Sequence, residues 1–419
     1  MRILYILHQF YPEFGGGTER VTLNLARAMQ RAGHYAHILA CTLESPNSDS
    51  EAPLKGAVHF VYQGLPVTLI SHEYLPETVD FSFETSKPLV ENLITWMDDE
   101  GFEVAHVTHS MRMGSALLAI QRLGIPYLAT LTDFYFACYR VNLVDHLNQI
   151  CLGPDQGVKC GNTCLTYPWT QEGLVGRYQQ ALSILNGAGD LVCPSEYVAA
   201  HFRNIFPELT FRVIPHGIDM LALGERKVSW PVMMPPEVLR LGFIGSIVPE
   251  KGLDILLHAL AKVPDAKIQL CVIGGIYHSN SYVSELKRLV SNDSRVEYLG
   301  YLSSEMVYRE FREFDVLCVP SRVPESFSLV LHEAMVVGVP ALVSNLGAPA
   351  ERISQHGGGR VLPVDDVDAW ASALVELIND PQIVGRWRGE LNLPLRVEEE
   401  AFFYESLYRR LHFASRSKR

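Results

Sequence analysis

The sequence contains no hydrophobic run long enough to cross a membrane. Although 48% of the 419 residues are hydrophobic, no stretch stays apolar over the roughly 18 residues that a membrane-spanning helix requires. The apolar N-terminal segment has only the length of a strand, and it lacks a basic flank and a small-residue cleavage site. We therefore expect a cytoplasmic protein without a membrane-spanning helix.

Positive charge is also scarce. The chain has 35 Lys and Arg residues against 47 Asp and Glu residues, which gives a net charge of −12. A general nucleic-acid-binding protein is excluded, because such proteins neutralise phosphates with a basic surface. One exception is the basic tail RRLHFASRSKR, residues 409–419. We interpret it as a solvated terminal face, and the alternative is peripheral contact with anionic lipid at the inner face of the membrane.

Internal repeats and low-complexity segments are absent, so the length must be explained by ordinary globular domains. A chain of this size exceeds one hydrophobic core and favours two domains. In the N-terminal half, short apolar runs at 2–7, 34–42, 104–109, 127–132 and 190–195 alternate with helical patterns such as 19–33. Strands that alternate with helices predict a parallel sheet covered on both faces.

The same pattern starts again after a proline-rich segment at 220–237, which we expect to be an interdomain loop. Strands are predicted at 239–246, 267–275, 296–301, 315–321 and 340–345, with helices between them. We therefore expect an α/β protein with domains at 1–216 and 217–395, and a helix at 396–419 that crosses back onto the first. Ligands bind at the carboxyl ends of parallel strands, so we expect the two sheets to face each other across a cleft.

The strongest motif is PESFSLVLHEAMVVGVP, residues 324–340, which follows a predicted strand and opens a helix. The backbone N–H groups of Phe327, Ser328 and Leu329 at the helix start suit a diphosphate. Glu325 precedes the helix, where a carboxylate can bind sugar hydroxyls, and Glu333 lies two turns inside. The alternative is that Glu325 only complements the helix dipole and Glu333 is solvated.

Two glycine-containing loops support this interpretation. In GFIGSIVPEKGLDILLHAL, residues 242–260, a strand ends at Gly245 and a loop carries Lys251, whose charge could reach the same phosphates. The alternative is an ordinary surface lysine. FGGGTER, residues 14–20, lets the backbone approach a ligand closely, but it is not a complete dinucleotide-binding fingerprint.

Together these motifs resemble the retaining family 4 glycosyltransferases of GT-B fold. The resemblance covers nearly the whole chain, and its pieces are GGTER at 16–20, AHVTHS at 105–110, TLTDFYFACYR at 130–140, VIPHGID at 213–219, PEKG at 249–252 and the segment from Glu325 to Glu333. It implies a nucleotide-diphosphate sugar as donor, UDP- or GDP-linked, a saccharide or lipid-linked acceptor, and no metal or other cofactor. A role in surface polysaccharide or glycoconjugate synthesis is also implied.

The resemblance also implies roles for individual residues. Lys251 would bind the diphosphate, Glu325 the donor sugar and Glu333 the ribose. Further donor contacts would come from backbone and small residues, namely Gly16, Gly17, Gly245, Ser246, Gly274 and the stretch Phe327–Leu329. The acceptor side would hold His109, Thr132 and Asp133, with Asp133 as the nearest carboxylate to the reacting centre.

Two positions depart from the family's pattern. Ser246 stands where many relatives have an arginine, so one phosphate-binding cation is missing unless Arg322 or another residue replaces it. Thr132 stands where many relatives have a histidine beside the donor sugar. Asp133 could act as a nucleophile, orient the acceptor, or only cap the turn after its strand.

Four cysteines, Cys138, Cys151, Cys160 and Cys164, cluster in the sequence. They could hold a structural zinc ion, but the spacing differs from paired CxxC motifs, so free thiols or a redox-labile pair stay open. Asp366 and Asp368 form a DxD sequence, which we interpret as a helix N-cap rather than a metal site.

Three functions remain open from the sequence. The favoured one is glycosyl transfer. A second is an enzyme of the same fold that acts on the sugar nucleotide alone, such as a 2-epimerase, which would convert the donor without an acceptor. The third is a non-catalytic binder. A nicotinamide-dependent dehydrogenase is disfavoured by the incomplete fingerprint, and the sequence leaves the oligomeric state open.

Overall fold

The structure is a computed structural model that describes residues 1–44, 54, 56–164, 169–220, 238–276, 281–291 and 293–416. The chain divides into two compact units, each treated by itself below. The first unit comprises Met1–Gly217 and Leu395–Arg419, and the second comprises Ile218–Pro394. The loop expected at 220–237 lies outside the described residues except for its first residue.

The first unit contains an eight-stranded sheet with the strand order β3-β4-β2-β1-β5-β6-β7-β8. All neighbouring strands are parallel except the edge pair β3 and β4, an antiparallel hairpin that the sequence analysis did not anticipate. The strands are β1 Arg2–Ile6, β2 Tyr35–Thr42, β3 Ala57–Tyr62, β4 Leu65–Ser71, β5 Val104–Val107, β6 Tyr127–Thr130, β7 Asp190–Cys193 and β8 Arg212–Val213.

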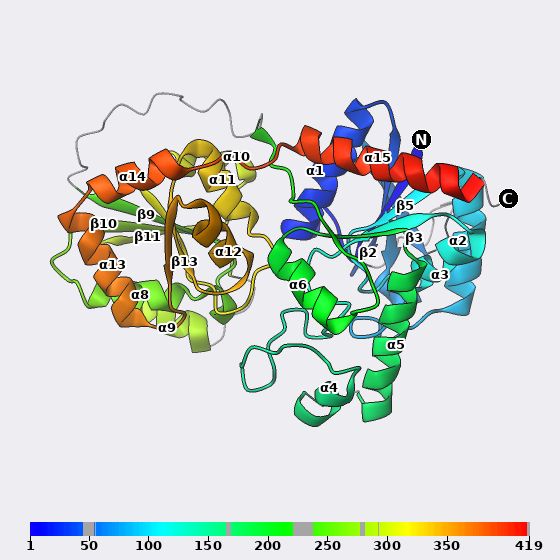
Figure 1. Ribbon diagram of the computed structural model, residues 1–419, viewed down its shortest axis with the longest axis horizontal. Coiled ribbons are helices and arrows are strands. Elements are labelled where there is room, and N and C mark those ends of the chain that lie inside the picture. The colour runs from blue at the N-terminus through cyan, green and yellow to red at the C-terminus, as the bar shows by residue number, and fades with distance from the viewer. Residues whose placement is uncertain are drawn as a thin grey trace. The chain divides into compact units, whose positions relative to one another are not determined.

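Helices cover this sheet, and the last helix of the chain belongs to them. They are α1 Gly17–Arg31, α2 Lys87–Glu100, α3 Gly114–Leu123, α4 Val158–Thr163, α5 Gln171–Gly187, α6 Glu196–Ile205 and α15 Val397–Arg416, with a 3₁₀ turn at η1 His72–Tyr74. Helix α15 contacts α1 and β5, and Figure 1 shows it in red beside the blue α1. The C-terminal helix therefore packs on the N-terminal sheet.

The second unit contains a six-stranded sheet, entirely parallel, with the order β11-β10-β9-β12-β13-β14. Its strands are β9 Leu239–Ile244, β10 Ile268–Ile273, β11 Val296–Gly300, β12 Val316–Val319, β13 Ala341–Ser344 and β14 Gly359–Leu362. Its helical elements are η2 Pro249–Lys251, α8 Leu253–Ala261, α9 Ser281–Val290, α10 Ser304–Phe311, α11 Leu329–Val337, α12 Gly347–His356, α13 Val367–Asn379 and α14 Gln382–Glu390.

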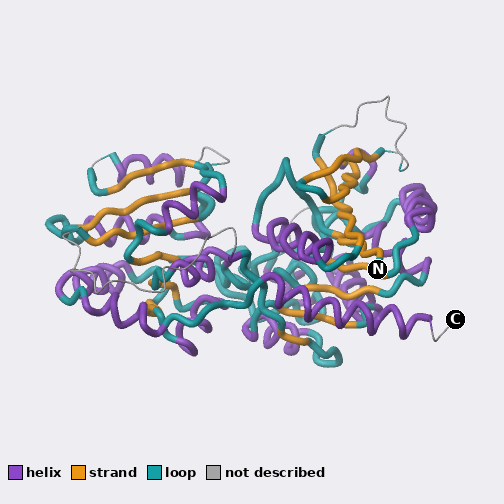
Figure 2. Tube along the Cα trace, turned by 90° about the horizontal axis from the view of Figure 1, so that it is seen from above, coloured by secondary structure: helices purple, strands orange, loops and turns teal. Residues whose placement is uncertain are grey.

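The central strands of both sheets are buried on both faces. In β1, Leu4 belongs to one hydrophobic cluster and its neighbour Tyr5 to another, because successive side chains of a strand point to opposite faces. In β12, Cys318 and Leu317 divide in the same way between two clusters. Figure 2 shows helices flanking the stacked strands of the second unit. The predicted α/β fold with two parallel sheets is confirmed.

A buried polar network joins α15 to the first sheet. His106 of β5 is fully buried, and its ring nitrogens hydrogen-bond the hydroxyls of Tyr408 and Thr130, each at 2.7 Å. Tyr404 bonds Thr130 at 2.7 Å, and Tyr408 bonds Tyr5 at 3.2 Å. Burial lowers the pKa of His106 to about 3, so this imidazole is neutral. The helix is thus held by directional bonds as well as by apolar packing.

The start of α15 is held at the point where the chain leaves the first unit. The buried carboxylate of Glu400 accepts the backbone N–H of Gly217 at 2.9 Å and lies 3.2 Å from His216. A Cβ on Gly217 would lie 2.5 Å from the Cα of Val397, so only glycine permits this approach. In the described part of the chain, no helix combines the length and the apolar character needed to cross a membrane.

Candidate active site

The second unit brings Lys251 and Glu325 together at the carboxyl ends of two neighbouring strands. Lys251 ends η2, after β9, and Glu325 lies in the loop after β12. The Lys251 ammonium donates to Oε1 of Glu325 at 2.7 Å, and the Ser321 hydroxyl donates to the same oxygen at 2.5 Å. The Glu325 side chain is 11% exposed and that of Lys251 34%. Lys251 is thus a partly buried lysine paired with Glu325, and its predicted contact with the diphosphate stays a prediction.

Electrostatics keep Glu325 ionised. Burial by itself raises the pKa of this carboxyl, but the Lys251 ammonium and the hydrogen bonds from Lys251 and Ser321 outweigh burial and hold the pKa below its ordinary value. The site therefore presents one fixed anion and one fixed cation, partly buried and side by side. Such a pair suits a ligand that carries both hydroxyl groups and phosphates.

Two glycines allow the backbone to close around this site. Gly252 has a φ of +68°, and a Cβ there would lie 2.1 Å from the carbonyl oxygen of Pro320. A Cβ on Gly274, after β10, would lie 1.8 Å from the carbonyl oxygen of Gly245. Side chains at either position would push the loop of Lys251 away from its neighbours.

Helix α11 starts directly after the Glu325 loop. Its N-cap is Ser328, which has a φ of +67°, and Gly338 ends the helix, as predicted. The ring of Phe327 stacks on His332 at 3.9 Å, and His332 also bonds the Ser328 carbonyl at 2.9 Å, which fixes the first turn. The first N–H groups of an α-helix have no partner within the helix, so this end offers donors to an anion.

Glu333 is buried on α11 and not solvated. The residue is only 4% exposed, and its Oε1 accepts a hydrogen bond from the Tyr308 hydroxyl at 3.4 Å. The alternative of a solvated glutamate is therefore wrong. Tyr308, on α10, is a partner that the sequence analysis did not identify, because nothing in the local pattern links these two helices.

Arg322, the candidate replacement for the missing arginine at position 246, is already paired with two carboxylates. Its guanidinium donates to both carboxylate oxygens of Asp254, at 2.7 and 2.6 Å, and to Asp365 at 2.5 Å. Its charge is thus already balanced within the unit. Asp366 accepts the backbone N–H of Ala369 at 2.9 Å, which confirms the predicted N-cap of α13.

Another polar cluster lies in the first unit, at the carboxyl ends of β5 and β6. The backbone N–H of Met111 donates to Nδ1 of His109 at 3.2 Å, so this nitrogen carries no proton. Nε2 therefore holds the proton and donates it to Asp133, 2.5 Å away. The other oxygen of Asp133 accepts the N–H of Tyr135 at 2.9 Å. Asp133 thus caps its turn and orients His109 at the same time.

Thr132 lies beside this pair in the position where a histidine was expected. Its hydroxyl donates to the carbonyl of Thr108 at 2.8 Å, and the Thr18 hydroxyl donates to it at 3.3 Å. A threonine here ties the β6 loop to the β5 loop and to α1. Thr132 is 8% exposed, and its side chain has no group that titrates.

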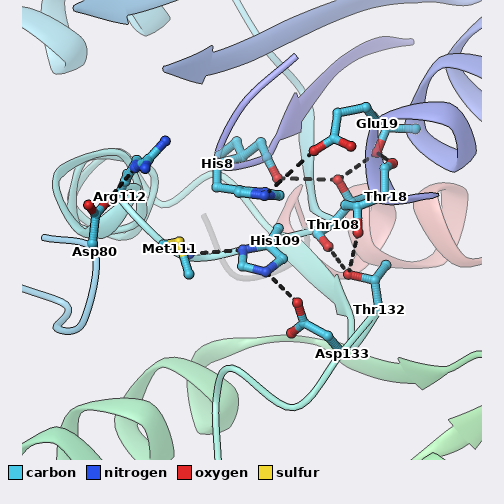
Figure 3. A network of polar contacts seen from close by, with 12 residues as sticks. His8, Thr18, Glu19, Asp80, Thr108, His109, Met111, Arg112, Thr132 and Asp133 are labelled. Carbon is cyan, nitrogen blue, oxygen red and sulfur yellow. Dashed lines mark hydrogen bonds and ion pairs between the residues drawn. The ribbon is translucent and has the colours of Figure 1, made fainter. Parts of the chain in front are cut away.

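Two members of this cluster, His8 and Glu19, were missed by sequence analysis. His8 follows β1, and Glu19 lies in the first turn of α1; their side chains approach to 3.5 Å (Figure 3). The His8 ring lies 3.9 Å from that of His109. The rule that carboxyl ends of parallel strands meet at one edge would have found them, because β1 and β5 are neighbours.

Arg177 of α5 fixes the loop that carries Asp133. This buried guanidinium donates to the carbonyls of Phe81, at 2.7 Å, and of Phe136 and Tyr135. It also lies 4.7 Å from the centroid of the Tyr135 ring, which packs in turn against His109. Arg177 therefore positions the cluster without belonging to it.

The four clustered cysteines do come near one another. Burial and the neighbouring thiols of Cys138, Cys151 and Cys164 raise the pKa of Cys160 to about 12. Yet among the residues that the structure describes, no group of three or more His, Cys, Asp or Glu side chains is arranged to hold a metal ion. The Cys151 thiol donates to the Gly153 carbonyl instead. All four are free thiols, and the geometry does not support the zinc interpretation.

The glycine-rich loop at Gly16 and Gly17 forms the start of α1, and Gly16 is the N-cap. A Cβ on Gly16 would lie 2.6 Å from Oε2 of Glu19, so the glycine makes room for this buried carboxylate. The predicted contact of Gly16 and Gly17 with a donor phosphate stays a prediction.

Two family models match the chain. Residues 15–220 match the family model described as Glycosyltransferase Family 4, and residues 239–380 match the model described as Glycosyl transferases group 1. The first match contains His109 and Asp133, and the second contains Lys251 and Glu325.

Known relatives agree with the family models. A phosphatidyl-myo-inositol mannosyltransferase of Mycolicibacterium smegmatis is 24% identical over 88% of this chain and 82% of its own length. A D-inositol 3-phosphate glycosyltransferase of Mycolicibacterium gilvum is 29% identical over 42% of this chain and 40% of its own.

Solved structures show the same fold. Sucrose-phosphate synthase from Thermosynechococcus elongatus superimposes with a TM-score of 0.72 at 19% identity, over 99% of this chain and all of the other. Anabaena Alr3699/HepE, in complex with UDP and glucose, gives a TM-score of 0.68 at 18% identity, over 97% of this chain and 99% of the other. The chain therefore belongs to the family 4 and group 1 glycosyltransferases, enzymes of GT-B fold that transfer a sugar from a nucleotide donor.

Proposed function

We propose that this enzyme transfers a sugar from a UDP- or GDP-linked donor to a hydroxyl of a saccharide or lipid-linked acceptor, with retention of the anomeric configuration. The observation that carries the proposal is the Lys251–Glu325 pair beside the start of α11. The name of the mycobacterial mannosyltransferase supports a lipid-linked acceptor. The reaction would belong to surface polysaccharide or glycoconjugate synthesis, in the cytoplasm or at the inner face of the membrane.

In this proposal each residue of the second unit has a separate task. Lys251 and the first N–H groups of α11 bind the diphosphate, and Glu325 accepts hydrogen bonds from sugar hydroxyls. Glu333 binds the ribose, the backbone at Gly245 and Ser246 makes further contacts with the donor, and Gly274 borders the nucleobase. Lys251 is already oriented by Glu325 in the unliganded enzyme, so little reorganisation is needed when charge develops on the leaving diphosphate. No metal ion is required for this step.

We expect that a nucleoside diphosphate raises the melting temperature of the wild-type protein, because a ligand of the native state stabilises it. Screening UDP, GDP, ADP and dTDP identifies the base. Glu333→Ala should then weaken the best nucleotide by at least about tenfold in calorimetry, since a charged hydrogen bond contributes ~1.5–3 kcal/mol. EDTA should leave transfer largely intact.

The matched control is Glu376→Ala, which removes a 54% exposed glutamate paired with Arg360 in the same unit. Its nucleotide affinity should equal that of the wild type. Unchanged affinity in Glu333→Ala would contradict the ribose assignment. Loss of activity in EDTA with recovery in Mg²⁺ or Mn²⁺ would contradict metal independence, and conversion of the donor without an acceptor would favour the 2-epimerase alternative.

We further propose that transfer follows a front-face route. The bond between the anomeric carbon and the diphosphate oxygen breaks while the acceptor oxygen forms its bond on the same face, and the acceptor proton passes to the departing diphosphate. Asp133, held by His109 and by the Tyr135 amide, orients the acceptor hydroxyl. This route needs positioned groups and charge stabilisation rather than a titrating side chain at Thr132.

Asp133→Asn should therefore lower turnover only modestly, by about tenfold, because the amide keeps one hydrogen bond but loses the charge. Thr132→Ala should change turnover little, and it serves as the neighbouring control. Steady-state kinetics with saturating donor measures both. A glycosyl adduct on Asp133, found by mass spectrometry after incubation with donor alone, would show a covalent route instead.

A further inference from the structure

Arg322 connects several segments of the second unit. It lies in the loop after β12, next to Ser321, whose hydroxyl donates to Glu325. Its guanidinium donates to both carboxylate oxygens of Asp254, at 2.7 and 2.6 Å, and to Asp365 at 2.5 Å. Asp254 lies in the first turn of α8, and Asp365 directly precedes the N-cap of α13. One side chain therefore ties the loop after β12 to the starts of two helices.

Arg322 also binds the short turn that carries Lys251. Its guanidinium donates to the carbonyl oxygen of Pro249 at 3.1 Å, and its backbone N–H donates to the carbonyl oxygen of Glu250 at 2.8 Å. Pro249 and Glu250 are the first two residues of η2, and Lys251 is the third. A 3₁₀ turn of three residues has few hydrogen bonds of its own. The contacts with Arg322 therefore help to fix where the Lys251 backbone lies.

The bonds between Arg322 and Asp254 join two ionised groups that are largely shielded from solvent. The Arg322 side chain is 28% exposed and that of Asp254 is 17% exposed. Burial by itself raises the pKa of Asp254, but the hydrogen bonds from Arg322 and from the Tyr282 hydroxyl outweigh burial and hold this pKa below its ordinary value. A guanidinium that donates to both oxygens of a carboxylate fixes its partner in orientation as well as in distance.

The same bonds indicate an indirect role for Arg322. Its charge is balanced by Asp254 and Asp365, so the charge that the proposed site offers to a diphosphate comes from Lys251. A cation lowers the barrier to transfer only if it already lies where negative charge develops. A displacement of about 1 Å can cost a factor of about 100 in rate. The exact position of the Lys251 ammonium therefore matters, and a residue that fixes its turn affects the reaction.

We propose that Arg322 is a positioning residue for sugar transfer, which fixes the turn of Lys251 so that the ammonium lies where the leaving diphosphate gains charge. The inference rests on the proposed function and deepens it, because it names what preorganises the cation of that site. Lys251 has a flexible four-carbon stem, so its ammonium needs a fixed backbone as well as the bond to Glu325. Arg322 acts through Lys251 and does not itself touch the diphosphate.

The test is a double-mutant cycle of Arg322→Gln and Lys251→Met in the full chain. Calorimetry measures the affinity for UDP and for GDP, and thermal unfolding measures stability. Arg322→Gln should weaken the better-bound nucleotide by about tenfold when Lys251 is present, because the ammonium is then misplaced. In the Lys251→Met background the same change should weaken binding by less than about twofold, since no ammonium is left to position. The loss of stability should be similar in both backgrounds.

A conservative variant guards against a failure to fold. Arg322→Lys keeps the charge that Asp254 and Asp365 require, but a single ammonium cannot make the two parallel bonds to Asp254. It should recover part of the lost nucleotide affinity and not all of it. Should Arg322→Gln fail to fold, Arg322→Lys takes its place in the cycle. Full recovery by lysine would overturn the proposal, because charge alone would then be sufficient.

The matched control is Arg295→Gln. Arg295 is a partly buried arginine of the same unit that pairs with Asp293 and donates to the carbonyl oxygens of Leu260 and Val263, at the other end of α8. This variant should lose stability but bind nucleotide as the wild type does. A comparable loss of nucleotide affinity in Arg295→Gln would overturn the positioning role, because loss of stability would then be enough to weaken binding.

The outcomes separate this inference from the proposed function. If the wild type binds neither UDP nor GDP, or if Lys251→Met binds as tightly as the wild type, the proposed function is contradicted and the inference falls with it. If Lys251→Met weakens binding but Arg322→Gln has no effect, or has an equal effect in both backgrounds, only the positioning role is contradicted.

Discussion

Lys251→Met should lower sugar transfer by about 10²–10³-fold, the usual loss when one preorganised group that stabilises developing charge is removed. Methionine keeps most of the side-chain volume but no charge. The Lys251 ammonium is the cation bonded to Glu325 at the start of α11. In the proposed site, its loss would leave the diphosphate with the backbone N–H groups at the start of α11 as donors. Steady-state transfer assays with the nucleotide sugar found by screening measure the loss.

The same variant should also be less stable at neutral pH. Glu325 would stay buried without its cation, which should cost about 1–2 kcal/mol, because Lys251 is one-third exposed and solvent screens part of the pairing. In the wild type the pKa of Glu325 is lowered, so its contribution to stability is present above the unfolded pKa and is lost as the pH falls. In Lys251→Met the cation is gone and burial raises the pKa of Glu325, so this carboxyl becomes neutral as the pH falls. The difference in unfolding free energy between the wild type and the variant should therefore close towards pH 4.

A double variant separates activity from stability. Lys251→Met/Glu325→Gln removes the unpaired charge, since glutamine is neutral and can still accept a bond from Ser321. Its unfolding free energy at pH 7 should recover most of the loss, while its activity stays as low as that of the single variant. Recovery of activity along with stability would mean that Lys251 acts through the fold and not on the diphosphate. Lys262→Met, which removes an exposed lysine paired with Asp368, is the control.

His106→Ala should cause the largest loss of stability among these variants, about 3–5 kcal/mol, because it leaves a cavity and breaks two buried hydrogen bonds. For a unit of this size we expect the melting temperature of the first unit to fall by roughly 6–20 °C. Amide hydrogens of α15 should exchange faster, since Tyr408 loses its bond to β5. Thermal unfolding and hydrogen exchange measure the two effects.

The pH dependence of this variant gives a second check. The pKa of His106 is lowered to about 3, so the wild type loses stability as the pH falls below the ordinary histidine pKa, where the unfolded chain takes up a proton that the native state refuses. His106→Ala lacks this loss, so its stability deficit should shrink between pH 7 and pH 4. Phe413→Ala, on the exposed face of the same helix, should be nearly neutral. An equal deficit at both pH values would contradict a neutral buried imidazole.

Much of the fold could be predicted because the strands are parallel except at the edge pair β3 and β4, and the central strands are buried on both faces. Such strands are short apolar runs that alternate with amphipathic helices, as at β1 and α1 or β12 and α11. The edge hairpin of β3 and β4 escaped notice because β3 is only partly buried, so its alternation is weak. A local hydrophobic pattern reveals a strand only when the strand is buried, and an edge strand such as β3 is only partly buried.

Some residues of the candidate site could be predicted from the sequence and others could not. Lys251 and Glu325 were found because each lies in a loop with a characteristic sequence next to a strong strand. His8, Glu19 and Tyr308 were missed, because their significance depends on which strands and helices become neighbours. Whether Arg322 was available as a phosphate-binding cation could not be predicted either, since its partner Asp254 lies 68 positions away in the sequence.

The position of α15 has a consequence for synthesis of the chain. Residues of α15 complete the cluster that covers Tyr5, Val104 and Leu128, yet they are translated after the whole second unit. At usual elongation rates, that face of the first sheet stays uncovered for on the order of ten to forty seconds on the ribosome. The second unit, which is continuous in sequence, can reach its native state before the first. During translation the first unit should therefore begin to fold before the second unit but finish after it. Chaperones that bind apolar surface would find their target on the uncovered face of the first unit.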